Sequence, residues 1–300
     1  MSIQTKTFDE LEPALSLLER LAHARDTYVF RGHNRSEYRL LTTSERYYRL
    51  ITEVTSPMLA ELLSEFRVGL TKINAIPFEG DNRQDWLEYA RHCGIPTPCL
   101  DFTYSPYVAL FFAFTGVSDP PRAETENEYV VVYALNVNQL ATAWLRFWHR
   151  DSNAVDFSKA HWSFREQDDS FFEKEFPVSL KFLPSPGRHI KKMQKQHGAL
   201  IYAPVDWEFL HFKDLEDFID KTQEPSERLP DGTEKAGDYT LTKVFINTKC
   251  IRSVFEKLEL TLVTGATLFE DASGVAMDIM NSRHYVAKTN TMRDINFPLV

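Results

Sequence analysis

The sequence predicts an α+β fold: one large mixed domain built around a central sheet. Short β-rich runs and helical segments alternate irregularly along the 300 residues, and no internal repeat is present. Irregular mixing of this kind favours an α+β arrangement over a doubly wound parallel sheet. Hydrophobic residues make up 43% of the chain and include 22 phenylalanines, so a sizeable core rich in aromatic side chains can form.

Helical periodicity of apolar residues is clearest in the first third of the chain. It recurs over residues 8–25, 44–50, 57–73 and 84–92. Two β-rich runs lie between the first two of these segments, at residues 27–30 and 38–41, and we expect both to form short strands. Gly32 stops the first run, and the last helix is expected to end near Gly94.

The rest of the chain continues the mixture. Ser105 suits the cap and Pro106 the first residue of an apolar helix that runs to Phe114. Strands are predicted at residues 129–135, 199–203 and 241–246, and helices at residues 139–149, 190–197, 251–258 and 272–282. Polar stretches rich in proline or charge lie near residues 118–128, 151–178 and 222–238. We therefore predict a single domain over residues 1–300 that carries these stretches as variable insertions.

Composition argues against several classes of function. The formal charge of −9 makes nucleic acid an unfavoured partner, because phosphate neutralisation needs clustered Lys and Arg. No apolar stretch approaches the length of a membrane span, and the N-terminus lacks the apolar run of a signal peptide. Three cysteines without a framework pattern fit a reducing compartment. We therefore expect a cytoplasmic protein with no membrane partner.

Sequence motifs of the common cofactor and metal sites are absent. The chain has no Gly-rich dinucleotide fingerprint, no P-loop, no His-Glu-x-x-His and no Gly-x-Ser-x-Gly. The cysteines lack the paired spacing of a zinc site. The sequence thus predicts no metal site, and it implies no cofactor firmly.

The first candidate for chemistry is Arg31, which follows the apolar run at residues 27–30. Its ordinary interpretation is an arginine that leaves the core and reaches solvent. The functional interpretation is a guanidinium held at the edge of the sheet and facing a pocket. Gly32 would then let the backbone approach a ligand closely. Taken alone, this pair of residues favours the ordinary interpretation.

The segment from residue 91 to 113 shifts the balance towards a site. It contains a helix end, a turn fixed by prolines, a stretch dense in polar side chains and a helix start. A helix start favours an anion, because its free N–H groups form the positive end of the helix dipole. His92 and Asp101 are suited to handling a proton or a hydroxyl. The ordinary interpretations are a helix C-cap donor for His92 and a turn or N-cap residue for Asp101, but their clustering favours a functional site.

Two motifs in these segments resemble the FRG-domain family. The family is named for a Phe-Arg-Gly in its first strand, present here at residues 30–32. Its strongest stretch resembles Gln-His-x-Gly-Leu-Pro-Thr-Arg-Leu-Leu-Asp-Trp-Thr-x-x-Pro-x-x-Ala-Leu-x-Phe-Ala. The matching residues here are His92, Gly94, Pro96, Thr97, Leu100, Asp101, Thr103, Pro106, Ala109, Leu110, Phe112 and Ala113. Arg91, Pro98 and Phe102 replace Gln, Arg and Trp of the motif, and the lost arginine indicates a substrate that differs from those of relatives.

Weaker matches extend the resemblance over residues 8–280. Residues 41–46, which end in Arg46, resemble the family's Leu-x-Pro-Ser-Leu-x-Arg segment. Residues 192–198, which include Gln196, resemble its Arg-Ile-x-x-Gln-x-Gly segment, and residues 268–274 resemble its closing Leu-Phe-Pro-Asp-x-x-Gly. The central block of the resemblance is therefore more specific than its flanks.

The order of an early strand arginine, a central polar segment and a late polar position resembles ADP-ribosyltransferase folds. By this analogy the chain has a pocket for a small-molecule nucleotide, with NAD as a candidate substrate and ADP-ribosyl transfer or NAD cleavage as the candidate reaction. The candidate catalytic residues are Arg31, His92 and Asp101. The candidate ligand-binding residues are Gly32, Arg46, Thr97, Thr103, Tyr104, Ser105 and Gln196. Gln196 stands where those enzymes often carry Glu, which weakens the transferase interpretation.

A non-catalytic module that senses a nucleotide or binds a protein partner is the opposing interpretation. The same arginine, helix start and aromatic residues serve binding without turnover equally well. A structural domain whose motif only shapes a turn is a third interpretation, which the variety of polar side chains disfavours. FRG-type proteins are frequent in bacteria and their viruses, so the resemblance suggests a role in phage defence. Release of nicotinamide from NAD discriminates the enzyme from the sensor.

Overall fold

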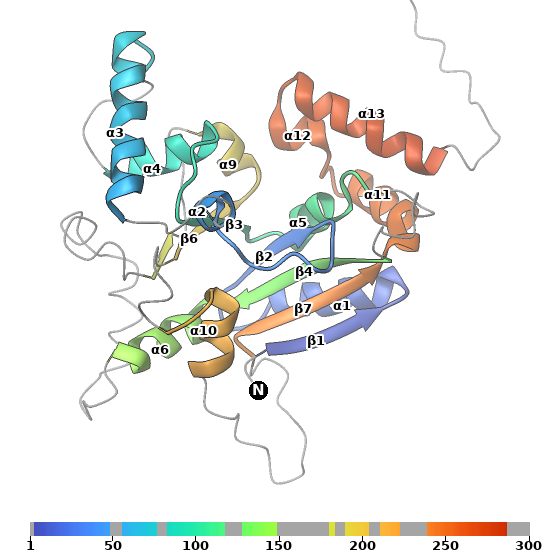
Figure 1. Cartoon of the computed structure of the whole chain (residues 1–300). Helices are drawn as coiled ribbons and strands as arrows, with labels where there is room; N and C mark the ends of the chain where they lie inside the picture. Colours follow the sequence, from blue (N-terminus) through green and yellow to red (C-terminus); the bar gives the residue numbers. More distant parts are fainter. Residues whose placement is uncertain are drawn as a thin grey trace, which may run out of the picture.

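The computed structural model describes residues 3–48, 56–76, 83–117, 128–148, 180–183, 190–203, 211–222 and 239–286. Within these ranges a seven-stranded sheet runs through the molecule in the order β1-β7-β4-β2-β3-β6-β5 (Figure 1). Its strands are β1 (Ile3–Phe8), β2 (Tyr28–His33), β3 (Cys99–Thr103), β4 (Tyr129–Asn136), β5 (Lys181–Leu183), β6 (Gly198–Tyr202) and β7 (Leu241–Asn247). Strands β1 and β7 pair in parallel, whereas the other neighbours pair antiparallel. The predicted α+β fold is confirmed.

Helices cover both faces of this sheet (Figure 1). Those of the first half are α1 (Leu11–Ala22), α2 (Thr43–Tyr48), α3 (Ser56–Lys72), α4 (Arg83–His92), α5 (Pro106–Phe114) and α6 (Val137–Trp148). Those of the second half are α9 (Lys191–Lys195), α10 (Leu215–Thr222), α11 (Ile251–Leu260), α12 (Gly265–Phe269) and α13 (Ala272–Val286), with a 3₁₀ turn, η1 (Thr248–Cys250), before α11. None of the helices among the described residues is long and apolar enough to cross a bilayer.

Strand β4 shows why the centre of the sheet is a continuous apolar run. Val130 and Val132 contribute to the core under α1 and α5, while Val131 and Tyr133 contribute to a second core on the other face. Successive side chains of a strand point to opposite faces, so a strand covered on both sides needs apolar residues at every position. Residues 130–135 are accordingly all buried.

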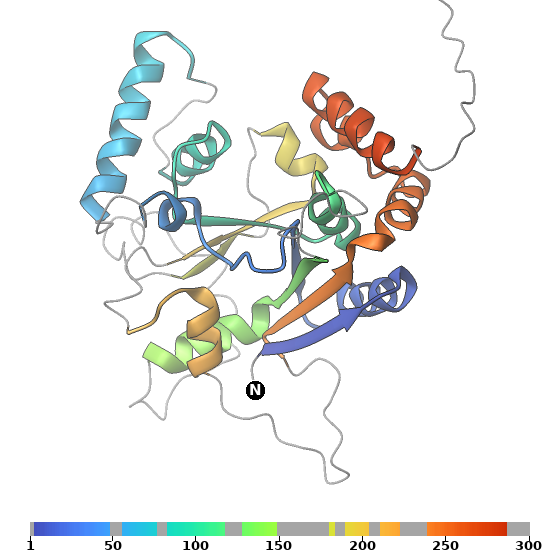
Figure 2. The same cartoon turned by 45° about the vertical axis from the view of Figure 1, so that its right-hand side comes forward.

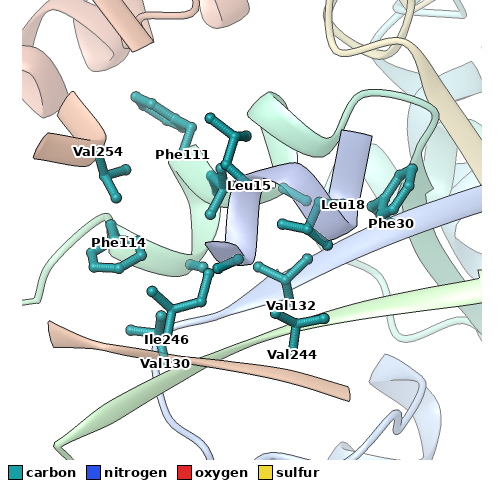
Figure 3. Packing of buried hydrophobic residues seen from close by; sticks show 14 of the residues in the cluster. Leu15, Leu18, Phe30, Phe111, Phe114, Val130, Val132, Val244, Ile246 and Val254 are labelled. Atoms are coloured by element: carbon teal, nitrogen blue, oxygen red, sulfur yellow. The ribbon is translucent and has the colours of Figure 1, made fainter. Parts of the chain in front are cut away.

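The larger core lies between the sheet and the helices α1, α5 and α11 (Figure 3). Its helical residues recur on α1 and α11 at the three- and four-residue spacing that puts them on one face of the helix, whereas α5 is buried on nearly every side. They include Leu15 and Leu18 of α1, Phe111 and Phe114 of α5 and Val254 of α11, which pack on Phe30, Val130, Val132, Val244 and Ile246 of the sheet. This core fixes α5 against β2, and both elements contribute to the site described below.

The second core contains a cluster of aromatic rings from α6, from α10 and from the segment just before α10. Trp144 and Phe218 pack edge to face with ring centroids 5.4 Å apart, and Phe212 and Phe218 do so at 5.1 Å. Phe147 joins the same cluster, 5.3 Å from Phe212. Edge-to-face geometry is the arrangement that aromatic quadrupoles favour. The cluster fastens α10 to α6.

The predicted strand at residues 38–41 is wrong, because this segment is an irregular loop. Side chains near the start of α10 satisfy its polar groups instead of a neighbouring strand. Glu216 accepts a hydrogen bond from the Leu40 amide at 2.8 Å, and Asp214 pairs with Arg39 at 2.8 Å. Both carboxylates are almost completely buried, so they anchor the loop firmly.

The predicted insertions near residues 118–128, 151–178 and 222–238 lie outside the described residues, apart from residues 128 and 222. Residue 128 precedes β4, and residue 222 ends α10.

Candidate functional site

A cavity of about 850 Å³ lies beside β2 and β3. Its walls also come from α4, α5, α9 and α12, from Arg46 in α2 and from the loop that follows β2. Figure 2 shows α9 between α4 on one side and the pair α12 and α13 on the other. The cavity therefore collects side chains from segments that are far apart in the sequence.

Arg31 lies in β2, and its guanidinium contacts two neighbours. Nη1 donates a hydrogen bond to the backbone carbonyl of Asp101 at 2.5 Å and lies 3.6 Å from Oδ2 of the same residue. Nε donates to Nε2 of His33 at 2.8 Å. The adjacent strands β2 and β3 bring these groups together, and only 14% of the Arg31 side chain is exposed. The guanidinium is thus fixed at the cavity and does not reach into solvent.

Arg91, near the end of α4, approaches the carboxylate of Asp101 from another side. Its Nε donates to Oδ1 at 3.2 Å, and its Nη2 donates to Oδ2. Such a two-point contact between a guanidinium and a carboxylate is the strong, orienting form of an ion pair. Asp101 is therefore held by Arg31 and Arg91 together.

The start of α2 is tied to the same cluster through Thr43. Its hydroxyl accepts from Arg91 Nη1 at 3.1 Å and from the Thr97 amide at 3.0 Å, and it lies 3.1 Å from the Thr97 carbonyl. The Ser44 amide donates to that carbonyl at 3.2 Å. These bonds set the position of α2 and hence of Arg46, which projects from it into the cavity wall.

Electrostatics keep Asp101 ionised. Burial alone would raise the pKa of its carboxyl group, but the charges of Arg91 and Arg31 and their hydrogen bonds outweigh burial and lower the pKa. The carboxylate nevertheless remains 42% exposed. Asp101 is thus an ionised carboxylate that is bound by two arginines and is still accessible from the cavity.

The positive charges of neighbouring arginines help to lower the pKa values of Arg31 and Arg46. Burial lowers the pKa of Arg31 to about 10, with Asp101 opposing this effect and the charges of Arg91 and Arg46 adding to it. Burial and the charge of Arg91 also lower the pKa of Arg46. The guanidinium groups of Arg31, Arg46 and Arg91 all stay charged at neutral pH and repel one another. A bound anion would reduce this repulsion.

His33 is neutral in this site. Burial and the charge of Arg31 lower its pKa to about 3. Because Nε2 accepts from Arg31, the hydrogen-bond network assigns the ring proton to Nδ1, which faces the Tyr38 carbonyl at 3.4 Å. His33 thereby orients Arg31 and leaves its charge undiminished.

The described residues that line the cavity carry a marked excess of positive charge. Five of them are basic and one is a carboxylate; they are Arg31, Arg39, Arg46, Arg91, Lys192 and Asp101. Arg39 is paired with Asp214, and Lys192 with Asp271. Arg46 is exposed and pairs with no described carboxylate. The excess occurs in a chain whose net charge is −9, so it is a local feature of the cavity.

Gly32 lies between the cavity and α5. A Cβ at this position would come within 1.9 Å of the Ala109 carbonyl oxygen and 2.7 Å of the Ala113 amide nitrogen. The close backbone approach that glycine permits here is therefore to α5. Gly32 also lines the cavity, so a ligand contact stays a prediction.

The other predicted site residues divide into two groups. His92, Thr103 and Gln196 line the cavity, as do Arg31 and Asp101. Partial burial and the charge of Lys192 lower the pKa of His92, which favours its neutral form. The Thr103 hydroxyl donates to the Gln196 carbonyl at 2.7 Å, which links β3 to the end of α9.

Thr97, Tyr104 and Ser105 are not among the residues that line the cavity. Tyr104 packs edge to face on Phe182, with centroids 6.4 Å apart, on the side of the second core. Ser105 caps α5 by accepting from the Val108 amide at 3.3 Å. Helix α5 contributes Val108, Ala109 and Phe112 to the cavity wall, and the helix-start anion site stays a prediction.

Sequence reasoning did not identify Arg91 or His33 as site residues. Arg91 stands beside His92 in the central motif, at the position where the FRG-domain motif has glutamine, and this departure was the available signal. His33 directly follows Gly32, and nothing in its sequence context indicates a buried imidazole. Among the residues that the structure describes, no group of three or more His, Cys, Asp or Glu side chains is placed to hold a metal ion.

Comparison with known protein families finds a match for one segment of the chain. Residues 26–121 match the family model of the FRG domain. No match was found among curated proteins or among solved structures. The matched segment contains β2, β3, α4 and α5, and with them Arg31, Arg46, Arg91 and Asp101.

Proposed function

We propose that this chain, which contains an FRG domain over residues 26–121, binds an anionic nucleotide-type ligand in the cavity beside β2 and β3. The observation that carries the proposal is the local excess of guanidinium groups. Arg31 and Arg91 share one carboxylate, and Arg46 has no described carboxylate partner. Guanidinium groups bind phosphate oxygens with two parallel hydrogen bonds, which suits them to this ligand class.

Asp101 acts in this proposal as a positioning residue. It holds Arg91 through two contacts and Arg31 through its carbonyl and carboxylate oxygens. A ligand anion that enters meets arginines whose orientation is already fixed, so little side-chain entropy is lost on binding. The single negative charge of Asp101 leaves the cluster of Arg31, Arg46 and Arg91 with a net positive charge.

A second candidate function is cleavage of NAD or transfer of its ADP-ribosyl group. The observation that favours it is that Asp101 is ionised yet 42% exposed. A fixed carboxylate at the cavity wall is suited to stabilise the positive ribosyl carbon that develops as nicotinamide leaves. In this mechanism Arg31 orients the phosphates and neutral His92 accepts a proton from the attacking group.

The contacts of Asp101 also support a non-catalytic alternative. Both carboxylate oxygens already bind Arg91, so part of the negative charge is neutralised before a substrate enters. A module that senses a nucleotide needs the arginines and no free acid. A cytoplasmic setting, a protein partner and a role in phage defence are further proposals, which rest on composition and on the family resemblance.

Titration calorimetry with ADP and NAD tests the binding proposal. Arg46→Ala is the preferred variant, because this side chain is exposed and supports no described ion pair. We expect affinity to fall by about 1.5–3 kcal/mol, the contribution of a charged hydrogen bond. Arg252→Ala removes the same charge on α11, away from the cavity, and should leave affinity unchanged. Equal affinity of the Arg46 variant and the wild type would contradict the proposal.

Release of nicotinamide from NAD separates the enzyme from the sensor. If the wild type releases nicotinamide, Asp101→Asn should abolish most of the activity, since it preserves shape and removes the charge. Full activity in this variant would show that the charge of Asp101 takes no part in the reaction. Binding of NAD without release of nicotinamide would favour the sensor.

A further inference from the structure

The residues that line the cavity include two chemically different groups. One group consists of Arg31, Arg46, Arg91 and Asp101, all within the segment that matches the FRG domain. We call this group the arginine end. The other group consists of Phe112 of α5 together with Lys192, Met193, Gln196 and Phe269, which we call the ring end. Four of these five residues follow residue 121, so the ring end comes mostly from outside the matched segment.

Aromatic and apolar surface dominates the ring end. Phe112 and Phe269 are partly exposed and pack edge to face, with centroids 6.1 Å apart. Met193 adds a thioether side chain to the same wall. Partly exposed aromatic rings beside a polarisable side chain are suited to a flat, π-bearing group.

The charge at the ring end is already compensated. Lys192 Nζ lies 2.6 Å from Oδ2 of Asp271 and 5.4 Å from the centroid of the Phe269 ring. A second ion pair joins Lys195 to Glu270 at 2.9 Å. These contacts fasten α12 to α9 and hold Phe269 in the wall. The ring end is therefore less suited to a phosphate than the arginine end.

Gln196 supplies the polar group that a heterocyclic base needs. Its backbone carbonyl accepts from Thr103, but no group among the described residues hydrogen-bonds to its side-chain amide. The side chain is half-buried and lines the cavity. An amide has two donors and an acceptor, which match the mixed donors and acceptors along the edge of a base.

We infer that the ligand is a nucleoside phosphate that binds with its phosphates at the arginine end and its base at the ring end. The inference rests on the proposed function and adds the orientation and the residues that select the base. Phe112 and Phe269 provide the surface against which the ring packs, and Gln196 bonds to its edge. Base selection is consequently assigned to α9 and α12, outside the matched FRG segment.

Calorimetry with two probes, ADP and inorganic pyrophosphate, tests this inference. Both probes carry the phosphates, and ADP alone carries the ring. We expect Phe269→Leu to weaken ADP binding roughly 5- to 100-fold, as for loss of one base–aromatic contact, and to leave pyrophosphate binding unchanged. Phe269→Tyr keeps the ring and should restore ADP affinity. Arg46→Ala should weaken both probes.

A second variant protects the test against a failure to fold, because Phe269 also packs on the core. Gln196→Ala leaves the core intact and should weaken ADP alone. Equal loss of ADP and pyrophosphate in the Phe269 and Gln196 variants would overturn the inference, as would ADP that binds no more tightly than pyrophosphate. If neither probe binds the wild type, the proposed function itself fails. If pyrophosphate binding depends on Arg46 but ADP gains nothing from the ring end, only the inference fails.

Discussion

At the scale of single residues, Asp101 organises the site. It accepts hydrogen bonds from Arg91 and Arg31, which arrive from a helix and from the neighbouring strand. An unpaired arginine in this cluster would be repelled by the other two and would lose solvation as it is buried. The carboxylate therefore allows three guanidinium groups to share one cavity wall.

Arg91→Ala tests this account through stability. The substitution removes both contacts to the carboxylate and the bond to Thr43, so the start of α2 loses an anchor. We expect the free energy of unfolding to fall by roughly 1–3 kcal/mol, nearer the lower limit because Asp101 is 42% exposed. Urea denaturation measures the change. Arg252→Ala, which breaks an exposed pair with Glu256, should cost about 0.5 kcal/mol or less.

His33 predicts a specific pH dependence. Its pKa is about 3 in the folded chain, compared with about 6.5 for an unperturbed histidine. Between these pH values the unfolded chain binds more protons, so stability falls as the pH drops from 6.5 towards 3. His33→Gln removes this contribution while the glutamine carbonyl still accepts from Arg31. The fall in Tm between pH 7 and pH 4.5 should therefore be smaller in the variant, and an equal fall would contradict the assignment of His33 as neutral.

The sequence allowed part of the site to be predicted at this scale. Arg31, His92 and Asp101 were expected at one cavity, and they line the same cavity. Tyr104 and Ser105 are sequence neighbours of Asp101 but do not line the cavity, because Tyr104 packs on the side of the second core and Ser105 caps α5. Arg91 was missed although it departs from the glutamine of the motif, because its partner Asp101 lies ten residues away and no local pattern encodes that contact.

At the scale of elements, the site depends on how closely β2 packs on α5. Gly32 permits that approach, since any Cβ would overlap the Ala109 carbonyl. The strand carries Arg31 and His33 on either side of this contact. Displacement of β2 from α5 would therefore move both residues relative to Asp101.

Gly32→Ala should destabilise the fold and disturb the site together. We expect a loss of about 1–3 kcal/mol or more in the free energy of unfolding, as for overpacking of a core. Gly69→Ala is the matched control, because Gly69 lies in α3 and nothing surrounds its added methyl group within 4 Å. That substitution should stabilise the chain by about 0.5–1 kcal/mol. Thermal unfolding should show a lower Tm for Gly32→Ala and a higher Tm for Gly69→Ala than for the wild type. A Gly32 variant as stable as the wild type would contradict the packing account.

The sequence predicted the helices more accurately than the strands. Periodic apolar residues located α1, α3 and α11 to within a few residues, because a one-sided helix leaves a clear pattern. Strand β1 was not predicted, since it lies at the edge of the sheet and few of its side chains are buried. Strand β3 was also missed, because Asp101, a residue of the site, interrupts its run of apolar residues.

At the scale of the whole molecule, the cavity depends on the order of the strands. β3 lies between β2 and β6, so residues near 31, 101 and 196 meet although long segments separate them in the chain. The sequence favoured an α+β fold but contains no local signal for this order. Strand order is decided by long-range pairing and by which faces the helices cover, and neither is visible in a short window of sequence.

The distribution of charged residues is also a property of the whole molecule. A chain of net charge −9 places four arginines, one lysine and a single carboxylate in the wall of one cavity. An anionic ligand would be drawn to this cavity selectively, and binding should weaken as salt screens the charges. The central claim is that the arginine end holds the phosphates of a nucleotide.

The most direct test of this claim is an experimental structure of the chain with bound ADP. The account predicts phosphate oxygens within hydrogen-bond distance of Arg46 and of Arg31 or Arg91, with the adenine ring beside Phe112 and Phe269. Phosphates bound elsewhere on the molecule, or an empty cavity at a saturating concentration of ADP, would contradict it.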